Sequence, residues 1–187
     1  TAMENIHIVY ISIFLILLMI CFVCKFLTYD PVHTKFPQTA IIKSYMHQDL
    51  LLDGITVNAE DFKICDATDI TNEIYFEEKQ SSASKLAVVT LNIMNTTGNK
   101  LYFDLPSVTL ESGNWIQSLS IDLFFELNKN FDSVIHPGRN ISIRVPFALY
   151  EAQFSSKEWK NIFGREFDII FELDPKKKFI SLKAMNF

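Results

Sequence analysis

The segment Ile8–Val23 reads IVYISIFLILLMICFV, and no Asp, Glu, Lys or Arg occurs from Asn5 to Cys24. A helix rises about 1.5 Å per residue, so an uncharged run of this length makes a helix of roughly 30 Å, the thickness of the hydrocarbon core of a bilayer. The run is apolar on every side, whereas a helix in a soluble core normally keeps a polar stripe. The sequence therefore predicts an N-terminal transmembrane anchor, residues 1–27, that contacts the membrane through Ile8–Val23.

Two kinds of export signal are alternatives to a retained helix. A cleaved signal peptide has a basic N-terminal region and a small-x-small cleavage site, whereas residues 1–5 hold no Lys or Arg and no Ala-x-Ala follows the run. A lipoprotein signal needs a small residue before the acceptor cysteine, but Ile20 precedes Cys21 and Val23 precedes Cys24. A retained single-pass helix fits these features best, and the two signals and a buried core helix stay as alternatives.

The charges that flank the helix bear on its orientation. Lys25, Lys35 and Lys43 follow the helix, and Glu4 is the one charged side chain before it. By the positive-inside rule, these lysines favour a domain on the cytoplasmic side. The character of the domain, described below, favours the opposite side.

The anchor is followed by a tether and one domain. Tyr29-Asp30-Pro31 and Phe36-Pro37 interrupt any continuation of the helix, because the residue before a proline is disfavoured in the α region. We therefore assign residues 28–40 to a tether and residues 41–187 to a single globular domain. A domain of this size can bury a sizeable hydrophobic core.

Charge and cysteine content narrow what the domain can do. The chain carries a net charge of −5, and Glu4 and Lys25 cancel within the anchor, so the anchor contributes none of it. A mildly acidic domain is a poor nucleic-acid binder, because phosphate contacts need clustered Lys and Arg. Cys65 is the one cysteine in the domain sequence, so the domain cannot form an internal disulfide. We therefore expect the hydrophobic core alone to stabilise the domain.

Apolar and polar residues alternate along the domain in short segments, which is typical of half-buried strands. Lys85–Met94 differs, because its first half is apolar on both faces and therefore predicts a central strand covered on both sides. His136-Pro137-Gly138-Arg139 predicts a type II turn. Residues 41–52 are ambiguous between helix and strand. The other predicted strands lie at 55–59, 62–65, 101–105, 108–110, 115–116, 119–127, 141–147, 167–173 and 180–184.

One helix and one basic run complete the pattern. Ser155–Glu158 is a capping box, in which the serine hydroxyl accepts from a free helix N–H and the glutamate reaches back. Trp159, Ile162 and Phe163 then give the helix an apolar face. We interpret the basic run Lys176–Lys178 as a solvated hairpin turn. Short strands without βαβ alternation predict a mainly β fold, an antiparallel two-sheet sandwich with one short helix.

Motifs that would indicate an enzyme are weak or missing. Ser82-Ala83-Ser84-Lys85 matches the Ser-x-x-Lys motif of penicillin-recognising enzymes, but the Ser-Asp-Asn and Lys-Thr-Gly partners do not occur in the sequence. Hydrolase elbows, zinc-protease motifs, Walker loops and dinucleotide fingerprints do not occur either. We therefore expect no enzyme, no catalytic residues and no cofactor, and an envelope hydrolase is the least favoured alternative.

Metal binding has weak support as well. The histidines do not have the spacing of zinc ligands, so we expect no zinc site. The polar loop 66–84 offers oxygen donors for calcium but lacks the glycine-centred twelve-residue pattern, so we interpret it as a solvated loop. The candidate ligands are His7, His33, His47 and His136 for zinc, and Asp66, Asp69, Asn72 and Glu73 for calcium.

Two surface features remain. Asn95-Thr96-Thr97 and Asn140-Ile141-Ser142 fit the glycosylation sequon, and we interpret both as chance matches at turns. Four aromatic residues are candidates for an exposed binding patch, although aromatic residues more often lie in a core or cover an edge. They are Tyr102, Trp115, Phe124 and Tyr150.

The order of these segments resembles a known group of proteins. The segments are Asp53-Gly54-Ile55, KLAVVTLNIMNTTGNKL (85–101), VTLESGNWI (108–116), HPGRNISIRVPF (136–147) and FDIIFELDPKKKFISL (167–182). Together with the apolar N-terminus they resemble the membrane-anchored or lipoprotein immunoglobulin-like domains of unknown function from Gram-positive bacteria. The resemblance implies an immunoglobulin-like sandwich at the cell surface and brings no catalytic residues. This sequence lacks a lipoprotein signal and in that respect differs from the lipoprotein members of the group.

These features together predict a membrane-tethered, single-pass protein with an extracellular immunoglobulin-like domain. We expect its partner to be a protein or a cell-envelope component, and not a nucleic acid. The alternative is a bitopic accessory subunit of a membrane protein complex. In assigning sidedness, the resemblance outweighs the flanking lysines.

Overall fold

The computed structural model describes residue 19 and residues 40–66, 84–103, 105–173 and 175–183. The predicted anchor, apart from residue 19, and nearly all of the predicted tether lie outside these residues. The transmembrane helix at 8–23 therefore stays a prediction. Among the described residues, no helix has the length and apolar character needed to cross a bilayer.

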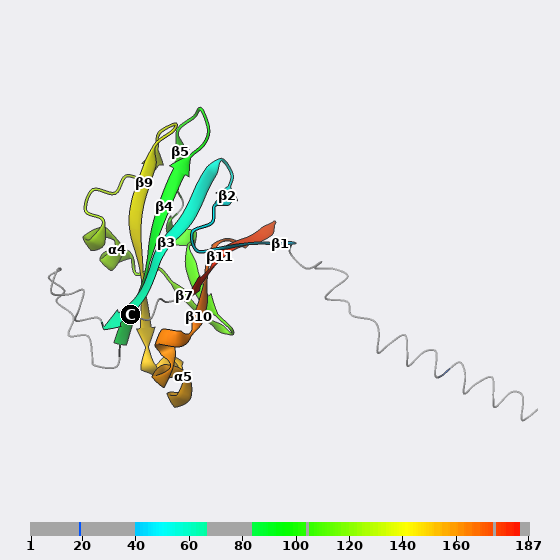
Figure 1. Ribbon diagram of the computed structural model, residues 1–187, viewed down its shortest axis with the longest axis vertical. Coiled ribbons are helices and arrows are strands. Elements are labelled where there is room, and N and C mark those ends of the chain that lie inside the picture. Colours follow the sequence, from blue (N-terminus) through cyan, green and yellow to red (C-terminus); the bar gives the residue numbers. More distant parts are fainter. Residues whose placement is uncertain (1–18, 20–39, 67–83, 104, 174, 184–187) are drawn as a thin grey trace, which may run out of the picture. The chain divides into compact units, whose positions relative to one another are not determined.

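Residues 39–187 form one compact unit, whose described residues include eleven strands and several short helices (Figure 1). In chain order the strands are β1 (Ala40–Tyr45), β2 (Leu50–Leu52), β3 (Ile55–Asp66), β4 (Ser84–Asn95), β5 (Leu101–Tyr102), β6 (Thr109–Ser112), β7 (Trp115–Ser118), β8 (Val134–Ile135), β9 (Asn140–Tyr150), β10 (Glu166–Glu172) and β11 (Lys176–Lys183). The helices are α4 (Ile121–Leu127) and α5 (Ser156–Lys160), with short 3-10 helices η1 (Leu105–Ser107), η2 (Glu151–Gln153) and η3 (Ile162–Gly164).

Two sheets build the sandwich. Sheet A has the strand order β1-β11-β10-β6-β7, sheet B has the order β2-β3-β4-β9, and β5 and β8 pair separately. Every pairing among the described strands is antiparallel except that β1 runs parallel to β11. The predicted mainly β sandwich is therefore confirmed, and one predicted strand is replaced by a helix.

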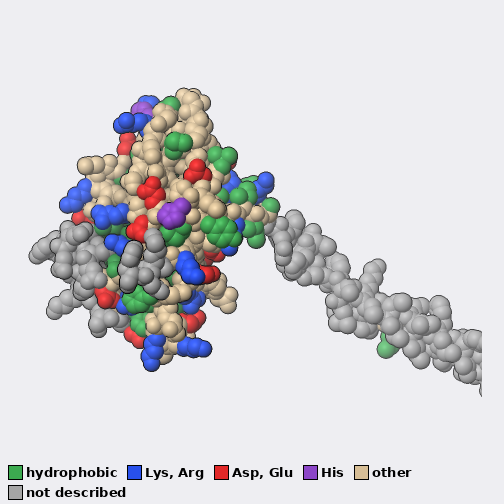
Figure 2. Space-filling model, viewed as in Figure 1, with side chains coloured by type: hydrophobic (Ala, Val, Ile, Leu, Met, Phe, Trp, Pro, Cys, Tyr) green, Lys and Arg blue, Asp and Glu red, His purple; other side chains and the backbone are tan. Residues whose placement is uncertain are grey.

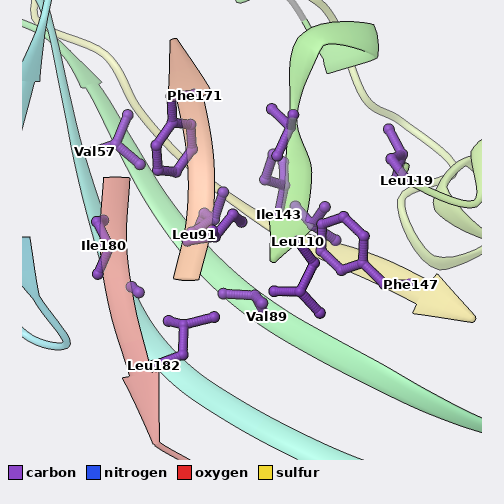
Figure 3. Close-up of a cluster of buried hydrophobic side chains, with 14 of the residues drawn as sticks. Val57, Val89, Leu91, Leu110, Leu119, Ile143, Phe147, Phe171, Ile180 and Leu182 are labelled. Atoms are coloured by element: carbon purple, nitrogen blue, oxygen red, sulfur yellow. The ribbon is translucent and has the colours of Figure 1, made fainter. Parts of the chain in front are cut away.

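The hydrophobic core lies between the facing surfaces of the two sheets (Figure 3). Successive side chains of a strand point to opposite faces, so the alternating apolar residues point inward together. The rings of Phe62 on β3 and Phe167 on β10 meet edge to face, with their centroids 5.7 Å apart. Of the residues labelled in Figure 3, sheet B contributes Val57, Val89, Leu91, Ile143 and Phe147, and sheet A contributes Leu110, Phe171, Ile180 and Leu182.

Strand β4 is buried on both faces, as its sequence predicts. Val89 lies in the main core between the sheets. Leu86 and Val88 belong to a second apolar cluster, which they form with Leu123 and Leu127 of α4. Helix α4 therefore covers the outer face of sheet B, and this cover explains why the first half of β4 is apolar throughout.

The predicted strand at 119–127 is wrong, because most of this segment forms α4. The buried residues Leu123, Phe124 and Leu127 have the three- and four-residue spacing of a helix face. In a strand, Phe124 would point away from the other two, whereas in a helix all three share one side. The odd-numbered apolar residues also fit strand alternation, and the contacts with β4 decide in favour of the helix.

Helix α4 also covers part of the free edge of β9. The N–H of Ser120 donates to the carbonyl oxygen of Pro146 at 3.0 Å. At the other end of the helix, Nδ2 of Asn128 donates to the carbonyl oxygen of Arg144, and Oδ1 of Asn128 accepts from the N–H of Arg144, both at 2.8 Å. An open strand edge pairs readily with other chains, so these contacts protect this part of β9.

The basic run Lys176–Lys178 begins strand β11, so the prediction of a solvated hairpin turn is wrong. Lys177 pairs with Glu111 on β6, and Nζ of Lys178 lies 2.9 Å from a carboxylate oxygen of Glu172. The hydrogen bond to Glu172 raises the pKa of Lys178. Because successive side chains alternate between the faces of a strand, these lysines reach separate carboxylates and do not form one basic patch.

Helix α5 begins at the predicted capping box. The backbone N–H of Ser155 donates to Oε2 of Glu158 at 2.9 Å, and the N–H of Glu158 donates to Oγ of Ser155 at 3.3 Å. Nη1 of Arg165 donates to the other carboxylate oxygen of Glu158 at 2.9 Å. The bonds from Ser155, followed by the bond from Arg165, lower the pKa of Glu158 from 4.5 to about 2.

We expect the carboxyl group of Glu158 to titrate near pH 2 in the folded chain, which a carbon-13 NMR titration measures. Because its pKa is lower in the folded state than in the unfolded state, the carboxylate contributes stability above about pH 4.5. That contribution is lost as the pH falls toward 2. Arg165→Ala should move the midpoint upward, and a midpoint near 4.5 in the unsubstituted chain would contradict this network.

Candidate functional site

The residues of the Ser-x-x-Lys motif do not gather into a described catalytic arrangement. Ser82 lies outside the described residues. Nζ of Lys85 lies 2.6 Å from a carboxylate oxygen of Asp66 and 4.6 Å from the centre of the Phe163 ring. Lys85 therefore joins β4 to β3 and to η3, as a structural cation.

The candidate metal ligands that the structure describes do not gather either. Within the described residues, no three His, Cys, Asp or Glu side chains come close enough to share a metal ion. The N–H of His47 donates to the carbonyl oxygen of Ala59 at 2.9 Å, and His136 begins the turn before β9. The candidates His7, His33, Asp69, Asn72 and Glu73 lie outside the described residues.

The first sequon has a structural role that its sequence does not reveal. Asn95 is fully buried, and its Nδ2 donates to the carbonyl oxygens of Ile135 at 2.8 Å and Asn99 at 2.7 Å. Its Oδ1 accepts from the N–H and the hydroxyl of Thr97, both at 2.8 Å. These four bonds use the full capacity of the amide, so Asn95 is closed to modification in the folded domain. Asn140 of the second sequon is exposed at the start of β9.

The four aromatic residues considered as a patch separate into two pairs. Phe124 is buried and Tyr102 is 75 % exposed, and both line the apolar groove described below. Nε1 of Trp115 donates to Oε1 of Gln153 at 3.3 Å, and the N–H of Tyr150 donates to the same oxygen at 3.2 Å. The structure therefore does not bring the four residues together into one exposed patch.

A polar cleft of about 740 Å³ lies between the segment that follows α4 and the first half of β9. Its charged residues are Lys129, Asp132, Arg139 and Arg144, and His136 also lines it. We call it the basic cleft. With His136 neutral, its lining carries three positive charges and one negative charge, whereas the whole chain carries a net charge of −5. Figure 2 shows Lys and Arg side chains (blue) interspersed with Asp and Glu side chains (red) over the side of the molecule where α4 and β9 lie in Figure 1.

Local hydrogen bonds fix the wall formed by α4 and the segment after it. Nη2 of Arg144 donates to the carbonyl oxygen of Leu127 at 3.2 Å, which turns this guanidinium toward the end of α4. The N–H of Val134 donates to Oδ1 of Asp132 at 2.9 Å, which orders the approach to β8. The cleft is therefore formed by residues whose backbone positions are set by bonds to neighbouring elements.

The predicted type II turn supplies the opposite end of the cleft. Gly138 has φ +67°, and the N–H of Arg139 donates to the carbonyl oxygen of His136 at 3.0 Å. A positive φ at the third turn position favours glycine, which explains the Pro137-Gly138 pair. The N–H of Gly138 also donates to the carbonyl oxygen of Asn95, so the turn that carries Arg139 is fixed to the end of β4.

The lining of the basic cleft suits oxygen-rich anions. Guanidinium groups donate in a planar fork that matches carboxylate and phosphate groups. The side chains of Thr90 and Ser142, which also line the cleft, are hydroxyl donors. The arrangement can bind and orient an anion without any covalent step.

A second hollow, of about 520 Å³, has an almost entirely apolar lining, and we call it the apolar groove. It lies between α4 and the segments that carry β5 and η1. Phe131 lines both the apolar groove and the basic cleft. The lining residues are Tyr102, Phe103, Leu105, Leu119, Ile121, Phe124, Phe125, Phe131 and Ser133.

Sequence reasoning missed both hollows because both depend on α4. If residues 119–127 are predicted to form a strand, there is no helix to cover the edge of β9 or to form the apolar groove beside β5. One signal was present in the sequence, since Phe124 departs from the alternation of its neighbours. The basic residues of the cleft lie 10 and 5 positions apart, at 129, 139 and 144, so no basic run marks them.

A comparison with protein families matches residues 38–178 to DUF5028, a domain of unknown function. No curated protein matches the chain.

The comparison with solved structures finds matches of low sequence identity. An uncharacterized β-sandwich protein from Clostridium difficile 630 is 12 % identical with a TM-score of 0.50, and the match covers 78 % of this chain and 97 % of that one. A candidate lipoprotein from Bacillus subtilis 168 gives 13 % identity and a TM-score of 0.47, over 74 % and 39 % of the two chains. A conserved hypothetical protein from Bacillus anthracis gives 12 % and 0.47, over 73 % and 94 %. The first of these matches shows the fold, a β-sandwich.

Proposed function

This chain belongs to the DUF5028 family of domains of unknown function, and from this premise we propose that it is a non-catalytic binding module. Its partner is an anionic protein or an anionic cell-envelope component that binds at the basic cleft. The module is an immunoglobulin-like domain, attached to the cell membrane by a single helix at Ile8–Val23, and it lies outside the cell.

The observation that supports the anionic partner is the excess of positive charge in one cleft of an acidic chain. Lys129 follows α4, Arg139 lies in the turn before β9 and Arg144 lies on β9, and all three line the same hollow. A cleft lined by one sign of charge attracts and orients ligands of the opposite sign. Carboxylate- or phosphate-bearing partners match this lining best.

The strand order supports the immunoglobulin-like assignment. In that fold the strands C, F and G form one sheet, while B and E are neighbours in the other. Here β6, β10 and β11 are consecutive in sheet A, and β4 and β9 are neighbours in sheet B. The parallel pairing of β1 with β11 adds a strand at the edge of sheet A.

The location is proposed from the sequence. The uncharged run Ile8–Val23 supports attachment, and the resemblance to surface domains supports an extracellular position. Protease added to intact cells should therefore cut the domain. If the domain is cut only after the cells are lysed, it lies on the cytoplasmic side, which is the orientation that the positive-inside rule predicts from the lysines after the helix.

We expect inorganic polyphosphate to bind the full chain, and the double substitution Lys129→Glu and Arg139→Glu to weaken binding by at least about tenfold. Both side chains are exposed, so the change should leave the fold intact. Isothermal titration calorimetry in a neutral detergent measures the affinity. Binding should also weaken as salt is raised, because salt screens contacts between exposed charges.

A matched control makes the same change in net charge elsewhere. Lys157→Glu and Lys160→Glu alter two exposed lysines of α5, outside the cleft lining. We expect this control to keep its affinity for polyphosphate within about twofold. An equal loss in both double variants would show that net charge, and not the basic cleft, governs binding.

A second candidate function, an accessory subunit of a membrane complex, is favoured by the surface of β1. Ile41 and Tyr45 on this edge strand and Leu51 on β2 are more than half exposed. Exposed apolar residues on an edge strand are common at protein interfaces. Crosslinking in membranes followed by purification tests this function: one stable partner, lost in Ile41→Lys, supports it, and a lone chain contradicts it.

A further inference from the structure

The apolar groove leaves large side chains in contact with solvent. Ile121 and Phe125 lie one turn apart on α4 and are 52 % and 56 % exposed, and Tyr102 on β5 is exposed beside them. The floor is formed by buried side chains, which include Phe124 and Leu119. Exposed apolar residues that cluster in this way are typical of binding sites, whereas single exposed apolar residues are common on any protein surface.

The volume of the apolar groove favours a small ligand over a protein surface. Its volume of about 520 Å³ falls within the range of roughly 300–1,000 Å³ that is typical of ligand pockets. Such pockets have a mostly apolar lining with a few polar groups that orient the ligand. An acyl chain can fill a hollow of this volume, whereas a stable protein–protein interface buries about 1,200–2,000 Å² of surface in total.

The neighbouring basic cleft indicates the charge of the ligand. Phe131 is a wall of both hollows, and Lys129 and Asp132 lie within two residues of it on the cleft side. A ligand that occupied both hollows would have its chain in the apolar groove and its head group in the basic cleft, with Phe131 between them. The excess of positive charge in that cleft favours an anionic head group over a neutral or cationic one.

We propose that the two hollows together bind an anionic amphiphile with a single acyl chain, such as a lysophospholipid with a phosphate monoester head group. The chain occupies the apolar groove beside Ile121 and Phe125, and the phosphate lies in the basic cleft near Lys129. This inference rests on the proposed function, because it names the class of anion that the cleft receives.

The probe is a photoactivatable C16 lysophosphatidic acid with a diazirine on its acyl chain, added to the full chain in phosphatidylcholine nanodiscs. Irradiation crosslinks the chain to the residues around it, and peptide mass spectrometry locates the sites. We expect crosslinks within residues 119–133. The same acyl chain with a phosphocholine head should label this segment at least about tenfold less, because its head group is not a net anion.

Substitutions in each hollow separate the contributions of chain and head group. Ile121→Asp should reduce labelling of residues 119–133 by about tenfold or more, because it places a charge against the acyl chain. Lys129→Glu should reduce labelling by the phosphate probe while leaving the phosphocholine probe unchanged. Ile116→Asp alters an equally exposed apolar residue on β7 and should have no effect, and circular dichroism of each variant checks the fold.

The outcomes distinguish this inference from the proposed function. Labelling confined to residues 8–23, or equal labelling by the probes with the two head groups, would contradict the binding of an anionic amphiphile in the two hollows. Glycerol 3-phosphate, which has no acyl chain, should not compete at the concentration of the probe, and competition by it would likewise overturn a role for the apolar groove. If polyphosphate still binds at the basic cleft in those cases, the proposed function stands and only the amphiphile fails.

Discussion

Replacing Phe124 with alanine should lower the free energy of unfolding by about 3–5 kcal/mol, the range for a large aromatic residue removed from a core. Phe124 is 1 % exposed, and its ring meets the ring of Phe131 edge to face with centroids 5.0 Å apart. It joins α4 to the main core, while Leu123 and Leu127 of the same helix lie in the second cluster. Urea unfolding followed by circular dichroism measures the change.

The adjacent residue supplies the matched control. Phe125 is 56 % exposed, so Phe125→Ala should cost no more than about 1 kcal/mol. If residues 119–127 formed the alternating strand that their pattern predicts, Phe125 would lie in the core with Leu123 and Leu127, and Phe124 would lie outside. Comparing the losses in the free energy of unfolding for Phe124→Ala and Phe125→Ala therefore distinguishes a helix from a strand. A larger loss for Phe125→Ala would contradict the assignment of these residues to helix α4.

Replacing Asn95 with alanine should cost about 2–5 kcal/mol, although the side chain is small and polar. The substitution removes the donors that satisfy the carbonyl oxygens of Ile135 and Asn99, and the acceptor for two groups of Thr97. Each buried polar group left without a partner costs about 1–3 kcal/mol, and water that enters the site recovers part of this loss. The midpoint of urea unfolding measures the result.

Another asparagine of the same strand is the control for this prediction. Nδ2 of Asn92 donates to a carboxylate oxygen of Glu60 at 2.8 Å on the solvent side of sheet B. Water can replace that bond, so Asn92→Ala should cost less than about 1 kcal/mol. Equal, small losses at Asn92 and Asn95 would contradict the role of Asn95 as the anchor between β4, β8 and the loop after β4.

The sequence predicts most of the fold because strand alternation is a strong local signal. Val89 and its neighbours on β4 identify a strand covered on both faces, and Gly138 identifies the turn before β9. The local pattern fails at 119–127, where the odd-numbered apolar residues fit strand alternation while Leu123, Phe124 and Leu127 fit the helix period. Only the contacts of Leu123 and Leu127 with sheet B select the helix, and these contacts join residues that are far apart in sequence.

The candidate site was beyond the reach of sequence reasoning for a related reason. Within the visible basic run Lys176–Lys178, Lys177 pairs with Glu111 and Lys178 pairs with Glu172. The cleft instead collects Lys129, Arg139 and Arg144, which are separated in sequence and carry no motif. Charge clusters built by topology are therefore invisible to a search for consecutive charges.

Hydrogen–deuterium exchange of the full chain, in neutral detergent, with and without inorganic polyphosphate, tests binding at the basic cleft most directly. We expect slower exchange for residues 128–144, which carry the basic cleft, and no change at Lys176–Lys178. Protection at Lys176–Lys178, or no protection anywhere at a saturating polyphosphate concentration, would contradict recognition of an anionic partner at the basic cleft.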